Sequence, residues 1–239
     1  MTEKISGGAF KQMVAFGAAC ITAQKQAIND LNVFPVPDGD TGTNMSLTIQ
    51  TAVNELRKAE PATVDEAAKL TASGLLRGAR GNSGVILSLL FRGIAKSLKG
   101  RETASAAEFA AAVSAGVDAA YKAVMKPAEG TILTVSRLGA QAAVAFAKDS
   151  TDFEGMLDAL LAAAREALAD TQNINPVLRR AGVVDAGGEG FVLVMDAMLG
   201  YLQGRTAAPV ASAAPAAAQA PKEGADFSEF DTGEITFGY

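Results

Sequence analysis

The 239-residue sequence contains no histidine, no tryptophan and a single cysteine, Cys20. Without histidine the chain cannot form a Ser-His-Asp or Cys-His catalytic site, or a histidine metal site. One cysteine excludes an internal disulfide and a cysteine-rich zinc site, and a reducing cytoplasm is the simplest compartment for such a chain. Any chemistry must therefore use carboxylates, hydroxyls, lysine, arginine, backbone amides or a bound metal.

Excess basic charge and long apolar runs are also missing. The net charge of −5 argues against nucleic acid as a partner, because nucleic-acid binders usually carry a basic surface. A nucleotide ligand stays open, since a cation can neutralise its phosphates. Residues 1–13 lack the apolar core of a signal peptide, and no stretch reaches the roughly 20 apolar residues of a membrane span. We expect a cytoplasmic protein without a transmembrane segment.

The sequence is rich in alanine and poor in aromatic residues, which favours close-packed helices over a sheet. Apolar spacing and capping patterns, among them the capping boxes that begin at Thr63 and Ser105, predict a series of helices and no convincing strand. The expected helices cover residues 8–30, 43–59, 63–77, 85–98, 105–125, 132–148, 152–170 and 177–181, and a last one ends near residue 202. Short connections between them predict an all-α, antiparallel bundle of about eight helices.

The character of the sequence changes after this helical part. Residues 1–203 read as one domain, and residues 204–230 as an Ala/Pro-rich linker without apolar periodicity. Residues 231–239 contain a β-prone fragment, which we interpret as the start of a following domain in a longer protein.

Residues 32–45, NVFPVPDGDTGTNM, place two carboxylates one residue apart. Pro35 and Pro37 favour extended backbone, in which Asp38 and Asp40 would face the same side with Gly39 between them. Hard cations such as Mg²⁺ bind carboxylate and phosphate oxygens together. Beyond the pair, Thr41, Thr43 and Asn44 lie at a predicted helix N-terminus, whose free amides favour an anion. The alternative is a turn in which Asp or Thr caps the next helix, and the spacing alone leaves the two about level.

Three further loops contain breaker residues, and in an antiparallel bundle several of them could meet at one end. GARGNSGV (78–85) offers Asn82 and Ser83 before a helix, although a plain helix connection explains it better in isolation. KPAEGT (126–131) reads as a helix stop and restart. VVDAGGEG (183–190) reads as a glycine turn in which Asp185 caps the last helix.

Together these motifs resemble fatty acid kinase. NVFPVPDGDTGTNM, GARGNSGVILS, AYKAVMKPAEGTILTV and GVVDAGGEG occur in the order expected of the N-terminal ATP-binding domain of its kinase subunit, over about residues 5–203. That domain is similar to the ATP-binding subunit of dihydroxyacetone kinase. The resemblance implies an antiparallel eight-helix barrel with ATP and Mg²⁺ held by loops at one end.

Carried over residue by residue, the resemblance makes Asp38 and Asp40 the catalytic Mg²⁺ ligands. It places Asn32 near a further metal-binding aspartate of dihydroxyacetone kinases, which leaves one metal or two. The residues that it assigns to ATP are Thr41, Asn44, Asn82, Ser83, Gly84, Asp185 and Gly187.

The implied reaction transfers the γ-phosphoryl group of ATP to a fatty acid carboxylate, and a separate fatty-acid-binding protein presents the acceptor. The alternatives are a kinase for a small polyol such as dihydroxyacetone, and a non-catalytic module that binds nucleotide for regulation. A homodimer formed through the full-length chain is a further expectation.

Overall fold

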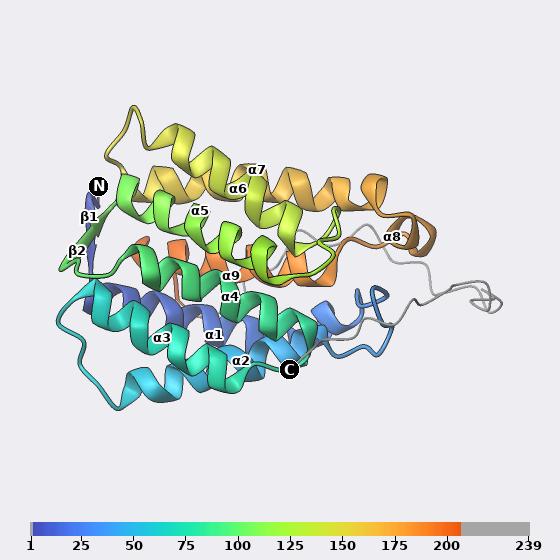
Figure 1. Cartoon of the computed structure of the whole chain (residues 1–239), viewed down its shortest axis with the longest axis horizontal. Coiled ribbons are helices and arrows are strands. Elements are labelled where there is room, and N and C mark those ends of the chain that lie inside the picture. Colours follow the sequence, from blue (N-terminus) through green and yellow to red (C-terminus); the bar gives the residue numbers. More distant parts are fainter. Residues whose placement is uncertain (1, 207–239) are drawn as a thin grey trace.

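The computed structural model describes residues 2–206, which form nine helices and two short strands (Figure 1). In chain order these are β1 (Lys4–Ser6), α1 (Gly7–Asn29), α2 (Thr41–Arg57), α3 (Val64–Gly78), α4 (Gly81–Ser97), β2 (Thr103–Ser105), α5 (Ala106–Ala123), α6 (Ile132–Phe146), α7 (Phe153–Ile174), α8 (Pro176–Ala181) and α9 (Ala186–Leu202).

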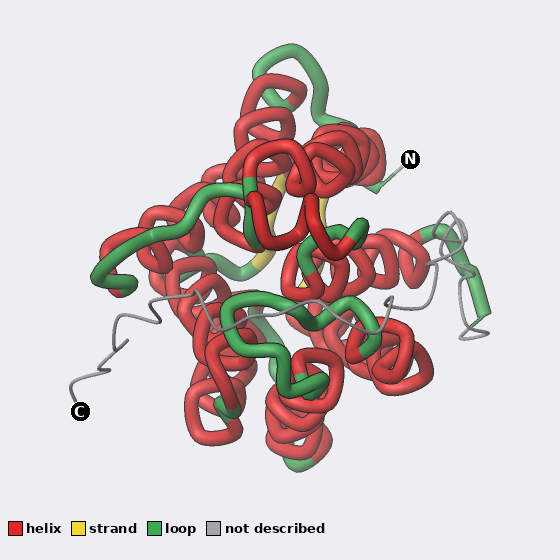
Figure 2. Tube along the Cα trace, turned by 90° about the vertical axis from the view of Figure 1, so that its right-hand side faces the viewer, coloured by secondary structure: helices red, strands yellow, loops and turns green. Residues whose placement is uncertain are grey.

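Eight of these helices form a closed antiparallel ring. Each helix from α1 to α6 packs against the next one in sequence, and α9 packs against both α7 and α1. The short α8 lies in the connection between α7 and α9 (Figure 1). Figure 2 shows the ring from the end at which α1 finishes and α2 begins. The predicted all-α, eight-helix architecture is confirmed.

Most helix boundaries agree with the sequence prediction to within a few residues. Both predicted capping boxes are present, with Thr63 and Glu66 at the start of α3 and Ser105 and Glu108 at the start of α5. The start of α4 was predicted four residues too late, because glycine and asparagine are weak helix formers and residues 81–84 read as a loop.

The expectation of no strand is wrong for the part of the chain that the structure describes. β1 and β2 form an antiparallel pair in which Ile5 lies opposite Ala104. Each strand has three residues, which is too short for an alternating pattern to be recognised.

Small residues allow the helices to approach closely. A Cβ atom at Gly93 of α4 would lie 2.5 Å from the backbone of Ala115 and Gly116, and one at Gly116 of α5 would lie 2.4 Å from the carbonyl oxygen of Leu90. Backbone contact at these distances excludes any side chain. The alanine-rich composition therefore serves tight helix packing as well as helix propensity.

The two ends of the ring differ. At one end β1 and β2 cross the bundle, and the buried rings of Phe10, Phe109 and Phe153 pack nearby, with centroid distances of 6.3 and 5.2 Å (Figure 1). At the other end lie the connections α1–α2, α3–α4, α5–α6 and α7–α9 (Figure 1). These carry the four predicted functional loops, so the expectation that the loops gather at one end is confirmed.

Contacts of the helical domain continue slightly beyond the predicted boundary at residue 203. Arg205 bonds the side chain of Asp196 on α9 at 3.0 Å. Most of the predicted linker (204–230) and the whole start of a following domain (231–239) lie outside the described residues. Within residues 2–206, none of the helices is both long enough and apolar enough to cross a membrane.

Asp185 joins three helices at the end that carries the loops. Its carboxylate accepts hydrogen bonds from the amides of Ile132 at 2.8 Å and Gly188 at 2.7 Å, so it caps α9 and also binds the first residue of α6. Its own amide donates to Thr171 of α7 at 3.1 Å. Burial raises the pKa of Asp185 to about 6, although the hydrogen bonds from the backbone oppose this shift.

The pKa of Asp185 predicts a pH-dependent stability. Because the folded state holds the proton more tightly than the unfolded state, this group's contribution to the free energy of unfolding falls as pH rises from about 4 to about 6. In Asp185→Asn the amide oxygen can still accept from both backbone amides without carrying a charge. We therefore expect the variant to lose this decline, which is on the order of 2–3 kcal/mol.

Urea unfolding of both proteins at half-unit steps from pH 4 to pH 7.5 measures the difference. The comparison uses the slope of the free energy of unfolding against pH rather than its absolute value. The NH₂ group that Asp185→Asn introduces must also find hydrogen-bond partners, which changes the absolute value. Parallel curves for wild type and Asp185→Asn would contradict the assignment.

Candidate functional site

The N-terminus of α2 is capped by residues of α1 and the following loop. Asp40 occupies the N-cap position, but its side chain makes no capping hydrogen bond. The side chain of Asn29 accepts from the amide of Thr43 at 3.1 Å and donates to the Thr43 hydroxyl at 3.0 Å. The alternative from the sequence, in which an Asp or Thr of the motif caps its own helix, is therefore not what the structure shows.

Asn32 provides the second cap. Its Oδ1 atom accepts from the amides of Asp40 and Thr41, at 3.2 and 3.0 Å, and from the Thr41 hydroxyl at 2.6 Å. Its Nδ2 atom donates to the carbonyl oxygen of Val36 at 2.8 Å. These contacts give Asn32 a structural task, and its role as a metal ligand stays a prediction.

Asp38 and Asp40 meet through a turn rather than through extended backbone. The expected extended conformation is wrong at Gly39, which has a φ of 65°, a value that glycine adopts without strain. Burial raises the pKa of Asp38, and the hydrogen bond and charge of the neighbouring Asp40 raise it further. Two carboxylates this close together would also favour a shared cation, because it neutralises the repulsion between them.

The N-terminus of α4 has no side-chain cap. Arg80 occupies the N-cap position without a capping hydrogen bond. In the described chain, the side chains of Asn82 and Ser83 form no hydrogen bond, and neither is fully buried. Free amides and the helix dipole make such an end suitable for an anion.

The starts of α2 and α4 are in direct contact. Thr48 donates to the carbonyl oxygen of Asn44 at 2.7 Å and accepts from the amide of Arg80 at 3.2 Å. A Cβ atom at Gly81 would lie 2.4 Å from the Asn44 side chain, and one at Gly84 would lie 2.4 Å from the Thr48 hydroxyl. The absence of side chains at these two glycines thus brings the uncapped end of α4 against the first turn of α2.

The loop between α5 and α6 is held by Glu129. Its carboxylate accepts hydrogen bonds from Tyr121, Thr134 and Arg137 at 2.6–2.9 Å. Burial opposes the charge of Glu129, but these hydrogen bonds outweigh it and lower the pKa. Thr131 caps α6, so the interpretation of KPAEGT as a helix stop and restart is confirmed.

The segment 185–190 differs from its prediction as a glycine turn. α9 already begins at Ala186, and the glycines lie in its first two turns. A Cβ atom at Gly190 would lie 2.6 Å from the sulfur of Met45, so this glycine allows α9 and α2 to pack closely. Asp185 caps the helix as expected. It is 5% exposed with its carboxylate directed at backbone amides, and Gly187 lies beside it, so the predicted contact of both residues with ATP stays a prediction.

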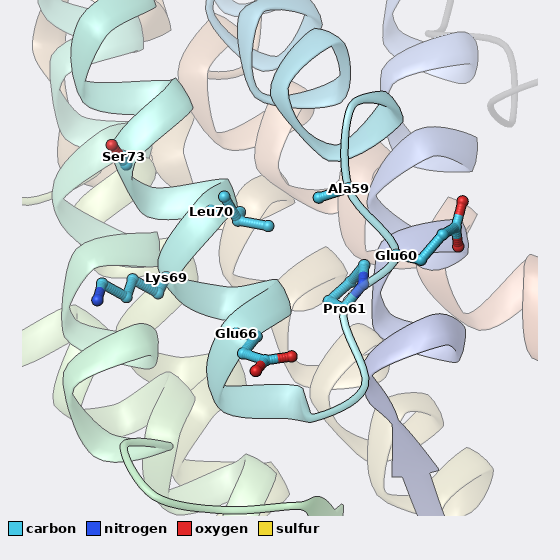
Figure 3. Close-up of a pocket in the computed structure, with 7 residues that line it drawn as sticks. All are labelled: Ala59, Glu60, Pro61, Glu66, Lys69, Leu70 and Ser73. Carbon is cyan, nitrogen blue, oxygen red and sulfur yellow. The ribbon is translucent and has the colours of Figure 1, made fainter.

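Two hollows of the surface lie away from these residues. One, of about 350 Å³, is formed by Glu60, Pro61, Glu66, Lys69 and neighbours at the opposite end of the ring; Figure 3 shows Glu66 and Lys69 pointing apart there. The other, of about 540 Å³, lies between α6 and α7. Neither hollow contains a residue of the four motifs. We place the candidate site at the N-termini of α2 and α4. The Asp40 carboxylate does not cap α2 there, and the first amides of α4 have no side-chain cap.

The donor set is suited to a cation that is shared with a ligand. Residues 2–206 contain no cluster of three or more Asp, Glu or Cys side chains that could hold a metal alone. Asp38 and Asp40 supply hard carboxylate oxygens, and Mg²⁺ commonly takes one or two protein carboxylates together with water and substrate phosphates. The uncapped end of α4 lies against the same helix start, so the residues present fit a metal bound with phosphate.

Two residues of the site carry no signal in the sequence. Asn29 reads as the end of a helix, and Thr48 reads as an ordinary position within one. Their roles depend on contacts between helices, which periodicity does not show. Spacing within the motif pointed to Asp38 and Asp40 but not to the residues that cap α2 in their place.

Comparisons with known proteins agree with this description. The DAK2 domain matches residues 35–200. The chain is 43% identical over 248 residues to an uncharacterised protein of Staphylococcus saprophyticus, a match that covers all of this chain and 43% of that protein. It is 45% identical over 202 residues to Protein YloV of Bacillus subtilis, covering 84% of this chain and 36% of YloV. The chain therefore spans less than half the length of these relatives.

Among solved structures, dihydroxyacetone kinase from C. freundii in complex with AMP-PNP and Mg²⁺ has a similar fold. The match has a TM-score of 0.63 at 20% identity and covers 80% of this chain and 33% of that one. The helical ring thus has the fold of a domain of that kinase. With the motif order, the eight-helix ring and the match over residues 35–200 in agreement, the chain belongs to the DAK2 domain family.

Proposed function

We propose that this chain is the ATP-binding domain of a kinase that phosphorylates a fatty acid carboxylate in the cytoplasm. ATP and Mg²⁺ bind at the N-termini of α2 and α4. The acceptor is presented by a separate fatty-acid-binding protein, and the product is an acyl phosphate. Because the chain spans less than half of its relatives, the complete reaction requires the full-length protein.

One observation carries the nucleotide site. The side chains of Asp38 and Asp40 do not cap α2, because Asn29 and Asn32 bind its first amides instead. The uncapped end of α4 contacts Asn44 and Thr48 of α2, the helix whose N-cap position is Asp40. Carboxylates for a cation and free amides for an anion are therefore found at two helix starts that pack against each other, an arrangement that suits a metal-bound phosphate.

Each side chain has a task in this proposal. Asp38 and Asp40 hold the cation, and Ser83, with the amides of Asn82 and Gly84, holds phosphate oxygens. Asn44 contacts phosphate from α2, and Thr41 orients the start of that helix. When bound, Mg²⁺ neutralises the negative charge that builds up on the phosphates.

This chemistry suits a protein without histidine in its sequence. Phosphoryl transfer depends mainly on positioning and on neutralising charge. A carboxylate acceptor is already ionised near neutral pH, so it requires no general base to become a nucleophile. The fatty acid assignment itself comes only from the resemblance to fatty acid kinase, because nothing in the four loops identifies the acceptor.

The second candidate is a kinase for a small polyol. It is favoured by the DAK2 match and by the fold shared with dihydroxyacetone kinase. A hydroxyl acceptor must lose a proton during the reaction, so this candidate requires a base that the complete protein or its partner would supply. A nucleotide-binding module without catalytic activity is the third reading.

The metal ligands are tested by thermal unfolding. We expect Mg-ATP to raise the Tm of the wild-type chain and to have little effect on Asp38→Ala or Asp40→Ala, whose helical circular dichroism should stay unchanged. The variants remove oxygens that would bind the cation, and neither side chain caps a helix.

Asp30→Ala is the matched control, because Asp30 is an exposed carboxylate of the same loop that only accepts a hydrogen bond from Gln26. It should keep the full Mg-ATP effect. An unchanged Tm increase in both Asp38→Ala and Asp40→Ala would rule out the metal assignment.

The phosphate contact is tested at α4. Ser83→Ala removes a hydroxyl that has no hydrogen-bond partner in the described structure, so the fold should be unaffected. A lost hydrogen bond to a charged phosphate predicts roughly tenfold weaker ATP binding. Isothermal titration calorimetry with AMP-PNP and Mg²⁺ measures the change.

Ser88→Ala is the control on the same helix, since the Ser88 hydroxyl is buried and donates to the carbonyl oxygen of Val85. This variant should alter stability and leave nucleotide affinity unchanged. Equal affinities for Ser83→Ala and wild type would contradict the placement of phosphate at α4.

The acceptor is identified by incubating the full-length protein with Mg-ATP and a fatty-acid-binding partner. Oleate should give ADP and an acyl phosphate that hydroxylamine traps as a hydroxamate, whereas dihydroxyacetone should give no product. Phosphorylation of dihydroxyacetone would favour the polyol kinase. Tight ATP binding without turnover on either acceptor would favour the regulatory module.

A further inference from the structure

We propose that Asn32 is a positioning residue that holds the Asp38–Asp40 turn in place, and that it is not a metal ligand. The inference rests on the proposed function, because it concerns the same metal site. It follows from the hydrogen bonds of one buried side chain, which is 6% exposed.

The hydrogen-bonding capacity of Asn32 is already occupied. A carboxamide oxygen has two lone pairs, and Oδ1 receives three donors from Asp40 and Thr41 at 2.6–3.2 Å. To bind a cation, this oxygen would have to release these donors. Two amides at the start of α2 would then lose their partner, which is costly at a buried helix end.

The same side chain connects the two sides of the turn. Its Nδ2 atom bonds the carbonyl oxygen of Val36 before the aspartates, while its Oδ1 atom bonds Asp40 and Thr41 at the end of the turn. In the described structure, the only other side chain with hydrogen bonds to the backbone of residues 33–40 is Asp38, which lies within the turn itself and bonds the amides of Asp38 and Asp40. Asn32 therefore determines where the two carboxylates lie relative to α2.

Asn29 gives a natural comparison. It caps the same helix, but its side chain bonds only Thr43 and makes no hydrogen bond to the turn. Loss of Asn29 should therefore weaken α2 without moving Asp38 and Asp40. A difference between the two asparagines separates positioning of the metal site from capping alone.

The test measures Asn32→Ala and Asn29→Ala by thermal unfolding in four states: nucleotide-free, with Mg²⁺, with ATP and EDTA, and with Mg-ATP. Both variants should lower the nucleotide-free Tm, by about 2–4 °C for one lost cap. Only Asn32→Ala should also require at least tenfold more Mg²⁺ to reach half of its maximal Tm increase in the presence of ATP.

Hydrogen exchange adds a readout that does not depend on metal. In the nucleotide-free state, amides of residues 40 and 41 should exchange faster in Asn32→Ala, whereas the amide of Thr43 should exchange faster in Asn29→Ala. Thr41→Val is a milder variant should Asn32→Ala fail to fold. It removes one of the three donors and should shift the Mg²⁺ requirement in the same direction by a smaller factor.

Three results would overturn the proposal. If Asn32 were a metal ligand, Asn32→Ala would weaken Mg²⁺ binding but leave the nucleotide-free Tm and the hydrogen exchange unchanged. If Asn32 only capped α2, both Asn32→Ala and Asn29→Ala would lower the Tm, and neither would change the Mg²⁺ requirement. If Mg-ATP fails to stabilise even the wild-type chain, the proposed function fails, whereas the positioning role of Asn32 is still decided by hydrogen exchange. Unchanged exchange at residues 40 and 41 in Asn32→Ala would overturn that role.

Discussion

The start of α2 depends on hydrogen bonds that come from the end of α1 and the loop after it. Asn29 and Asn32 bind the amides that a helix N-terminus leaves without partners, a task that Asp40 would otherwise perform from the N-cap position. This exchange of partners has an electrostatic consequence. Asp38 and Asp40 are left facing each other, and burial together with the neighbouring Asp40 raises the pKa of Asp38. The two carboxylates repel each other, but the start of α2 remains stable because Asn29 and Asn32 cap it.

The closed ring gives this local arrangement its setting. Antiparallel neighbours bring the four connections to one end, and β1 and β2 occupy the other (Figure 1). The N-termini of α9 and α4 differ in whether a side chain caps them. Asp185 caps α9 and binds the start of α6 from a buried position, whereas α4 begins without any side-chain cap. One helix end therefore serves stability, and the other is left available for a ligand.

The sequence predicts the fold well because helix signals are local. Capping boxes at Thr63 and Ser105 depend on residues three positions apart, and the structure has both. Glycine motifs were harder to interpret, since glycine weakens a helix but also allows close contact. The glycines at 187–190 therefore read as a turn, although they lie in the first turns of α9. Likewise, the strands at Ile5 and Ala104 are too short to leave a pattern.

For the candidate site, the motif spacing pointed to the Asp38–Asp40 pair without deciding between a metal site and a turn, and Ser83 was assigned to phosphate by resemblance. Asn32 was assigned to metal by resemblance, whereas its structural partners are Asp40, Thr41 and Val36. These partners lie four to nine residues further along the chain, and the way in which the loop folds back on Asn32 is not encoded by helix periodicity or capping patterns.

The most direct test of the central claim is a crystal structure of this chain with AMP-PNP and Mg²⁺. The account predicts a Mg²⁺ ion at about 2.0–2.1 Å from oxygens of both Asp38 and Asp40, with phosphate oxygens at the amides of α4. Asn32 would still bond Asp40 and Thr41 in that complex. Nucleotide bound elsewhere, or a metal held without either aspartate, would contradict it.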